Sequence, residues 1–164
     1  MKESQIKFLF RLFKTAVAAA DPLKVLPNFL PKYPGGKVVV VGAGKASARM
    51  AEAVENTWGP SNGLIITQAG YGRPLNNSLE LIEGSHPIPN IDCFNATTKI
   101  IQMLKNLHEN DFVLSLISGG GSALLCLPHP NISFKEKQQV HRSLLSSNAT
   151  IKEINVVRKH LSGV

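Results

Sequence analysis

Residues 112–122 read Phe-Val-Leu-Ser-Leu-Ile-Ser-Gly-Gly-Gly-Ser, a nearly continuous apolar run followed by three glycines between two serines. Such a run is typical of a buried strand in a parallel α/β sheet, which helices cover on both faces. Backbone N–H groups left bare at the carboxyl end of such a strand form a concavity that binds anions. We therefore expect the segment Ser118-Gly119-Gly120-Gly121-Ser122 to hold phosphate or carboxylate oxygens; the alternative is a flexible turn without a ligand.

A second glycine turn lies earlier in the chain, after a predicted strand over residues 37–41. It reads Gly42-Ala43-Gly44-Lys45-Ala46-Ser47 and opens a predicted helix over residues 46–57. It is not a Walker A loop, because that motif needs a glycine where Val39 stands. It is not the dinucleotide fingerprint either. Ser47 replaces the third glycine, and the next predicted strand, residues 63–68, ends without a carboxylate.

Lys45 is the charged residue of this second turn, and the pattern places it in the first turn of the predicted helix. The amino end of a helix already carries positive charge, so a cation there is unfavourable unless an anion joins it. Lys45 is therefore a candidate for facing an anionic ligand. The alternative is an ordinary solvated lysine.

Composition limits the partners of the chain. Its 164 residues carry a formal net charge of +7 and can form one domain with a sizeable core. Lys and Arg are scattered and aromatic residues make up only 6%, so we expect a small anionic substrate rather than nucleic acid. No apolar run approaches the length of a membrane span, so we expect no membrane partner. Cys93 and Cys126 lack metal-ligand spacing, and we expect buried, reduced thiols in a cytoplasmic protein.

The first twenty residues have helical periodicity, with apolar side chains at positions 6, 9, 10, 13 and 17 and basic ones between them. This pattern predicts an amphipathic helix that packs on the domain and ends near Asp21. A basic organelle transit peptide has the same pattern and is the alternative.

Helices and strands alternate along the rest of the chain. A short strand is predicted over residues 79–83, and a helix runs from Asp92, as its cap, to about residue 107. Two later helices begin with capping boxes, the first at Ser133 with Glu136 and the second at Thr150 with Glu153. The alternation predicts a Rossmann-like α/β fold, a layered parallel sheet with helices on both faces.

Two further segments carry candidate site residues. His86 lies between Gly84 and two prolines that stiffen the backbone, and an imidazole held there is suited to bind a hydroxyl or carboxylate. A histidine that merely packs the loop is the alternative. On the last predicted helix, Arg158 has a structural explanation in the helix dipole and Glu153 has one in the capping box. Asn155 has none.

Four segments together resemble the glycerate 2-kinase family, whose members carry a C-terminal MOFRL domain and are often labelled hydroxypyruvate reductase. Each motif alone is modest, but the ordered set is specific and runs from the first helix to the last residue. The segments are Val40–Ser47, Ser85-His86-Pro87-Ile88-Pro89, Leu116–Leu124, and Ala149-Thr150-Ile151 continuing through Asn155-Val156-Val157-Arg158-Lys159-His160-Leu161-Ser162.

The resemblance implies ATP-dependent phosphorylation of D-glycerate to 2-phosphoglycerate, with Mg²⁺. It implies that Lys45 acts at the phosphoryl-transfer centre as the catalytic residue, and no protein ligand to a metal is assigned. Phosphoryl transfer fits these residues, because it needs mainly positioned positive charge and N–H donors. The residues implied in nucleotide or substrate binding are Gly42, Gly44, His86, Ser118, Gly119, Gly120, Gly121, Ser122, Glu153, Asn155 and Arg158.

Members of this family are more than twice as long as this chain. The resemblance therefore implies that residues 1–164 are the N-terminal part of the family's first domain, without the MOFRL domain and without further catalytic groups. We expect this chain alone to be inactive or a poor kinase. A separately encoded C-terminal half is the expected partner that would complete the enzyme. Two alternatives remain: a nicotinamide-dependent hydroxypyruvate reductase, which the missing third glycine and acidic residue disfavour, and a non-catalytic half that binds a metabolite.

Overall fold

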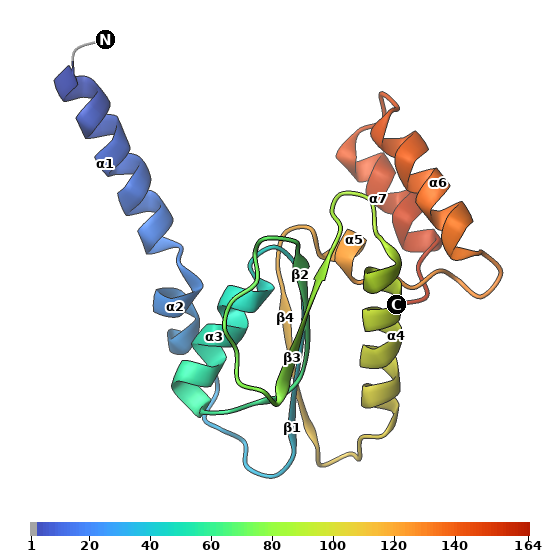
Figure 1. Cartoon of the computed structure of the whole chain (residues 1–164), viewed down its shortest axis with the longest axis horizontal. Helices are drawn as coiled ribbons and strands as arrows, with labels where there is room; N and C mark the ends of the chain where they lie inside the picture. Colours follow the sequence, from blue (N-terminus) through green and yellow to red (C-terminus); the bar gives the residue numbers. More distant parts are fainter. Residues whose placement is uncertain (1–2) are drawn as a thin grey trace.

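The computed structural model describes residues 3–164 and contains a four-stranded parallel sheet in the order β3-β2-β1-β4 (Figure 1). All three strand pairs are parallel, so the carboxyl ends of the strands meet at one edge of the sheet. This confirms the predicted layered α/β fold. The strands are β1 (Val38–Ala43), β2 (Asn62–Gln68), β3 (Leu79–Gly84) and β4 (Phe112–Ile117).

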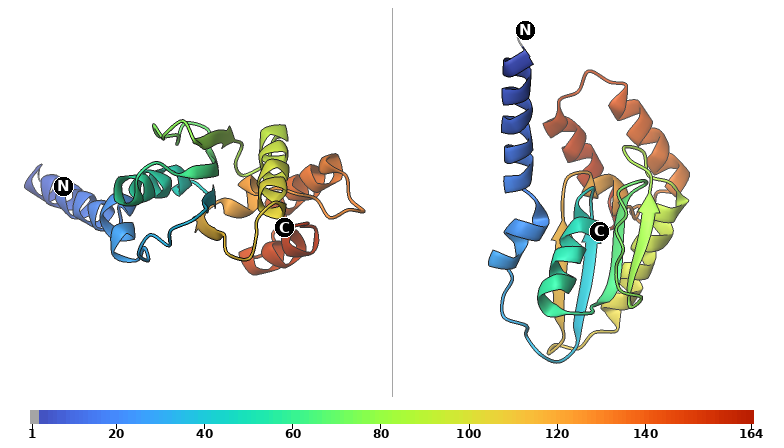
Figure 2. Two further views of the ribbon diagram at one scale, coloured as in Figure 1. Left: turned by 90° about the horizontal axis from the view of Figure 1, so that it is seen from below. Right: turned by 60° about the vertical axis from the view of Figure 1, so that its left-hand side comes forward.

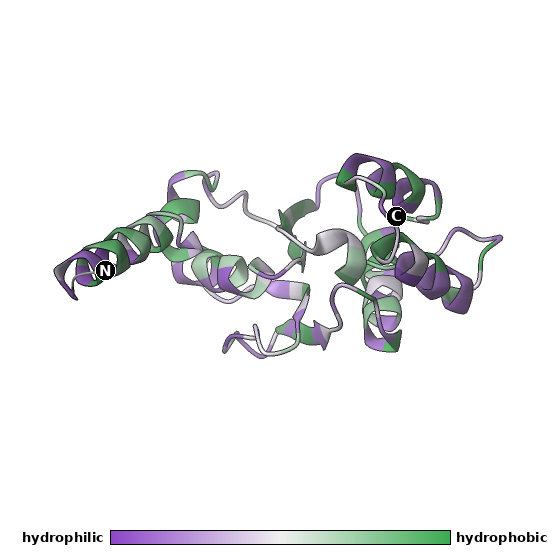
Figure 3. Ribbon diagram, turned by 90° about the horizontal axis from the view of Figure 1, so that it is seen from above, coloured by the Kyte–Doolittle hydropathy of each residue, from purple (hydrophilic) through white to green (hydrophobic). Residues whose placement is uncertain are grey.

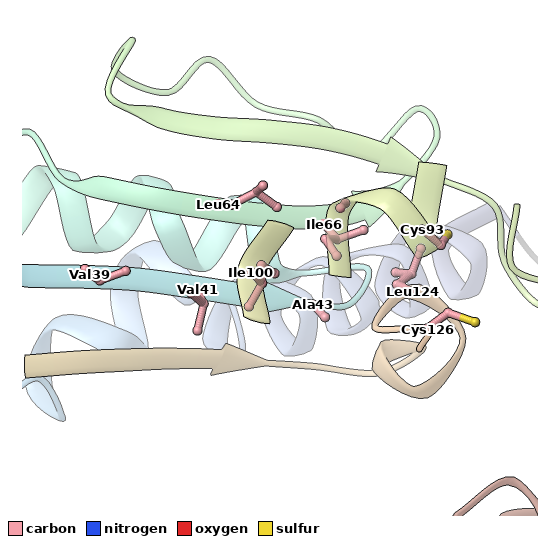
Figure 4. Close-up of a cluster of buried hydrophobic side chains, with 10 residues drawn as sticks. Val39, Val41, Ala43, Leu64, Ile66, Cys93, Ile100, Leu124 and Cys126 are labelled. Carbon is pink, nitrogen blue, oxygen red and sulfur yellow. The ribbon is translucent and has the colours of Figure 1, made fainter. Parts of the chain in front are cut away.

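The central strand β1 is buried at all six positions, which explains why its sequence is apolar without alternation. Helix α3 (Ser47–Trp58) covers one face of the sheet, where Ala51 and Val54 pack against Val40 and Ile65. Helix α4 (Ile91–Lys105) covers the other face. There Ile100 and Cys93 pack in a second cluster with members of β1 and β2 (Figure 4).

Three helices lie beyond the carboxyl edge of the sheet: α5 (Gly121–Leu124), α6 (Phe134–Leu145) and α7 (Ile151–His160) (Figure 1). Both predicted capping boxes are confirmed, at Ser133 for α6 and at Thr150 for α7. The end of α7 is tied back to the segment after α5. The amide of Gly163 donates to the Leu127 carbonyl at 2.9 Å, and Ser162 forms an isolated bridge with Pro128.

The N-terminal helix α1 (Glu3–Ala19) forms as predicted, but the predicted packing is wrong. It projects away from the sheet (Figures 1 and 2) and has no buried residue. Phe10 is 61% exposed and Phe13 66% exposed, and the ribbon of α1 carries hydrophobic positions along its length in Figure 3. No other element buries these side chains within residues 3–164.

The chain turns from α1 into α2 (Pro22–Val25) and the 3₁₀ turn η1 (Leu26–Asn28). Asp21 caps α2, accepting from the Leu23 amide at 3.1 Å, and its carboxylate binds the Arg49 guanidinium of α3 through two hydrogen bonds. Within residues 3–164 no helix combines the length and the apolar character that crossing a bilayer requires.

Candidate functional site

The two glycine turns predicted from the sequence meet at the carboxyl edge of the sheet, because β1 and β4 are neighbours. The Lys45 amide donates to the Gly119 carbonyl at 2.9 Å, and the Ala46 amide donates to the Ser118 hydroxyl at 3.0 Å. The Ser118 amide in turn donates to the Ala43 carbonyl at 3.1 Å. Each turn therefore uses the other to satisfy its backbone groups, and the two form one unit.

Gly44 makes this close approach feasible. Its φ is +140°, and a Cβ at this position would lie 2.1 Å from the Ser118 hydroxyl oxygen. The Gly44 carbonyl accepts hydrogen bonds from the Ser47 hydroxyl at 2.7 Å and the Thr67 hydroxyl at 3.1 Å. Ser47, which breaks the dinucleotide fingerprint, thus locks the turn in place with its side chain.

Gly42 has a packing role. It lies inside β1, where a Cβ would come within 2.9 Å of the Ile65 side chain and 3.0 Å of the Leu116 carbonyl oxygen. The space next to its Cα is thus filled by the neighbouring strands. Its predicted part in ligand binding stays a prediction.

Lys45, His86 and Gly120 are brought together, although three different strands lead to them. A Cβ on Gly120 would lie 3.0 Å from His86 Cδ2 and 3.4 Å from Lys45 Cγ. Gly120 has φ of +88°, which favours glycine, and nothing lies within 4 Å of the corresponding position at Gly119. Within residues 3–164 the amides of Gly119 and Gly120 have no hydrogen-bond acceptor, so they are free to bind an anion. We call this group, Lys45, His86, Gly119 and Gly120, the glycine cradle.

The charges around His86 are all positive. Its pKa is lowered, first by burial and then by the nearby charges of Lys45 and Arg158. At neutral pH the imidazole is therefore uncharged, with one nitrogen able to donate a hydrogen bond and the other able to accept one. The peptide bond between His86 and Pro87 is cis.

Lys45 does not lie in the first turn of a helix, as the sequence suggested. Helix α3 begins at Ser47 with Ala46 as its cap, so Lys45 precedes the cap and belongs to the loop. The difference arises because the loop needs one more residue to reach Gly119 before the helical hydrogen bonds begin. The Lys45 side chain is exposed beside the free amides.

Beside the glycine cradle is a cavity of about 450 Å³, between α5, α6 and α7. Four of the predicted residues line it: Gly121, Ser122, Asn155 and Arg158. Glu153 does not. Its carboxylate accepts from the Thr150 amide at 2.7 Å and the Thr150 hydroxyl at 2.8 Å, so the capping box occupies it.

Two residues of the cavity were missed in the sequence, Lys137 and His141. Lys137 is only 2% exposed and His141 is completely buried. The sequence carries a signal for them, because helical spacing places Lys137 and His141 on the same helix face as the apolar Phe134 and Leu144. Polar side chains on the inward stripe of a helix are uncommon and point to a specific environment.

The donors of the glycine cradle fit a phosphate group better than a metal ion. Free amides, an ammonium and an imidazole are the groups that bind phosphate oxygens. Magnesium prefers carboxylate and water oxygens, and residues 3–164 contain no group of three or more His, Cys, Asp or Glu side chains able to hold a metal. The described part of the chain thus offers phosphate ligands but no magnesium cage.

Known proteins resemble this chain closely. A family model described as a domain of unknown function, DUF4147, matches residues 8–164. A D-glycerate 2-kinase of Thermotoga maritima is 37% identical over 164 residues, which are 99% of this chain and 39% of that protein. A protein of Agrobacterium vitis named as a hydroxypyruvate reductase is 45% identical over 158 residues, 95% of this chain and 36% of that protein.

The same similarity holds for the fold. The crystal structure of a glycerate kinase from Thermotoga maritima aligns with a TM-score of 0.82 at 36% sequence identity, covering 99% of this chain and 40% of that one. The chain therefore spans between 36% and 40% of the length of these relatives.

Proposed function

Since this chain belongs to the DUF4147 family, we propose that its glycine cradle serves a glycerate 2-kinase reaction, in which a phosphoryl group passes from ATP to D-glycerate. Relatives named as glycerate kinases support this proposal. One observation carries it: Lys45, His86 and two free amides converge from three strand ends on one spot.

Each group has a role that its chemistry allows. The amides of Gly119 and Gly120 hold phosphate oxygens in fixed directions, so no reorganisation is needed when charge develops on them. The Lys45 ammonium neutralises charge on the transferring group. His86, neutral at this position, is suited to orient a hydroxyl of the substrate through one hydrogen bond. ATP supplies the phosphoryl group when bound.

We further propose that turnover needs groups beyond these residues, because the chain spans at most 40% of the relatives' length. The uncovered side chains on the edge strand β4 support this: Val113 is 39% exposed and Ile117 55% exposed. The chain by itself then binds ligand but transfers phosphate slowly or not at all. Residues that correspond to the rest of the relatives' length would complete the site.

The first experiment is a thermal-shift titration of the chain with Mg-ATP and, separately, with D-glycerate. A ligand that binds only the folded chain raises its melting temperature. We expect a rise with at least one of the two, and we expect Lys45→Ala to reduce it while Lys135→Ala, an exposed lysine on α6, leaves it intact. A cooperative melt that neither ligand shifts would refute ligand binding by this chain.

Reduction of hydroxypyruvate with a nicotinamide is the second candidate, favoured by the name of the Agrobacterium vitis relative. The chain lacks the third glycine of the dinucleotide fingerprint, and no carboxylate follows β2, which ends at Gln68. A fluorescence titration with NADH separates the two: saturable binding would favour the reductase. Metabolite binding without either reaction is the remaining outcome, shown by a thermal shift and no turnover once the missing part is supplied.

A further inference from the structure

His141 is a completely buried histidine with no hydrogen-bond partner. Neither Nδ1 nor Nε2 of its ring finds one within residues 3–164, and Arg158 Nε on the facing helix is also buried and unpartnered. Both residues line the cavity between α5, α6 and α7. Buried polar atoms in folded proteins almost always have partners, and an unpaired one costs about 1–3 kcal/mol. Three such atoms in one cavity indicate that something else pairs with them.

The cavity is also positively charged without compensation. Lys137 lines it and is 2% exposed, and its ammonium donates to the Leu127 carbonyl at 2.7 Å, its one hydrogen-bond acceptor within residues 3–164. Arg158 and Lys159 add two further cations from α7, and no Asp or Glu lines the cavity. Burying cations is unfavourable unless an anion joins them.

The titration behaviour agrees with this charge imbalance. The pKa of His141 is lowered to about 4, first by burial and then by the charges of Arg158 and Lys137. Burial also lowers the pKa of Lys137 and that of Arg158. An anion in the cavity would oppose these shifts, because it favours the charged form of each group.

We propose that this cavity binds an oxyanion, the phosphate or carboxylate group of a small molecule, through Lys137, His141 and Arg158. The site is separate from the glycine cradle: it lies against Gly121 and Ser122 and is enclosed by α6 and α7, whereas Lys45 and Gly119 do not line it. A neutral imidazole donates one N–H to the anion, and the guanidinium of Arg158 can do so with two. The proposal rests on the cavity alone and does not require phosphotransfer.

The test follows the ring resonances of His141 by NMR while inorganic phosphate and D-glycerate are added separately to the 164-residue chain. His141→Leu identifies these resonances by their loss. We expect a saturable shift that reports one dissociation constant. Saturation with phosphate alone assigns a phosphate group to the cavity, and saturation with glycerate alone assigns a carboxylate; both support the proposal. No saturable shift with either ligand would overturn it.

Matched variants separate this cavity from the glycine cradle. Arg158→Met should weaken binding by about tenfold or more, and Arg158→Lys should restore part of it, because the charge returns without the planar fork. Arg142→Met, an exposed arginine next to His141 on α6, should change it less than about twofold. Lys45→Ala should leave the His141 signal unchanged. If Lys45→Ala abolishes the shift, the anion sits in the glycine cradle, and the cavity proposal fails while the proposed function stands.

Should Arg158→Met fail to fold, His141→Leu supplies a second readout. Replacing the unpaired buried imidazole by the apolar leucine side chain should leave the melting temperature of the free chain equal or higher. It should also reduce the melting-temperature rise that the saturating ligand gives the unmodified chain. A lower melting temperature together with an undiminished rise would show that His141 is a packing residue and would overturn the proposal.

Discussion

Gly44→Ala tests whether the two glycine turns really depend on each other's backbone. The substituted residue would have to keep φ at +140°, with its Cβ 2.1 Å from the Ser118 hydroxyl oxygen and 2.7 Å from the Ser118 carbonyl oxygen. Because the nearest backbone atoms belong to β4's loop, the clash cannot be relieved by turning one side chain. The loop itself must move.

The cost has two parts. Holding a residue with a Cβ at positive φ costs about 1–2 kcal/mol, and forcing a methyl group into filled space costs about 1–3 kcal/mol. The sum is about 2–5 kcal/mol. This is a large share of the free energy of unfolding of a typical domain, which is about 5–15 kcal/mol. Gly70→Ala is the matched control, because Gly70 has φ of +82° but nothing within 4 Å of the added Cβ. The Gly70→Ala variant should show only the cost of the positive φ.

Urea unfolding followed by circular dichroism measures both variants. With a slope of about 1–3 kcal/mol per molar, the extra cost at Gly44 should lower the midpoint by roughly 1 M relative to Gly70→Ala. Ser118→Ala alone should lower the free energy of unfolding, because the Ala46 amide loses its acceptor. In the Gly44→Ala background the same substitution should lower it less, because it also removes the nearest clash. Equal destabilisation by Gly44→Ala and Gly70→Ala would refute the reasoning.

Three further predictions rest on other parts of the molecule. Deleting residues 1–19 should change the free energy of unfolding by less than about 1 kcal/mol, because α1 buries no residue; a clear loss in urea unfolding would mean that the helix packs after all. Burial raises the pKa of the Cys126 thiol to about 11, so at pH 8 it should react with a disulfide reagent at least about 100-fold more slowly in the folded than in the urea-unfolded chain, and similar rates would contradict this. Arg49 holds the pKa of Asp21 below its ordinary value, so the unmodified chain should be more stable than Asp21→Asn at neutral pH. That advantage should fade below about pH 4 as the carboxylate protonates, and a gap independent of pH in thermal melts would count against the ion pair.

The sheet and the glycine turns could be predicted because their sequence signals are local. A strand buried on both faces must be apolar at every position, and β1 was recognisable from that alone. The strand β4 was also recognised from its apolar sequence, but the predicted cover on both faces is wrong, because β4 is the edge strand of the sheet and leaves Val113 and Ile117 exposed. The boundaries were less accurate, because caps depend on loop geometry. Asn90, not Asp92, caps α4: its side chain accepts from the Cys93 amide at 3.2 Å, while Asp92 lies in the first turn.

The convergence of the site followed from topology rather than from any single motif. Because the sheet is parallel, the segments after β1, β3 and β4 share one edge, where Lys45, His86 and Gly120 lie near one another. Periodicity cannot say which surface covers an apolar helix face, and for that reason the packing predicted for α1 was wrong. It also could not say what lies opposite Lys137 and His141, since the groups facing them come from α7.

The two candidate anion sites use different means to hold charge. The glycine cradle relies on free backbone amides and an exposed lysine, groups that water can satisfy when no ligand is bound. The cavity at His141 relies on side chains that are buried and unpaired, which water reaches poorly, so it is costly to leave without a ligand. Removing the ligand from the cradle therefore takes away only the stabilisation that its binding affinity supplies. In the cavity the binding affinity also includes relief of the penalty on three buried polar atoms, so at equal ligand concentration a ligand bound there should raise the melting temperature more.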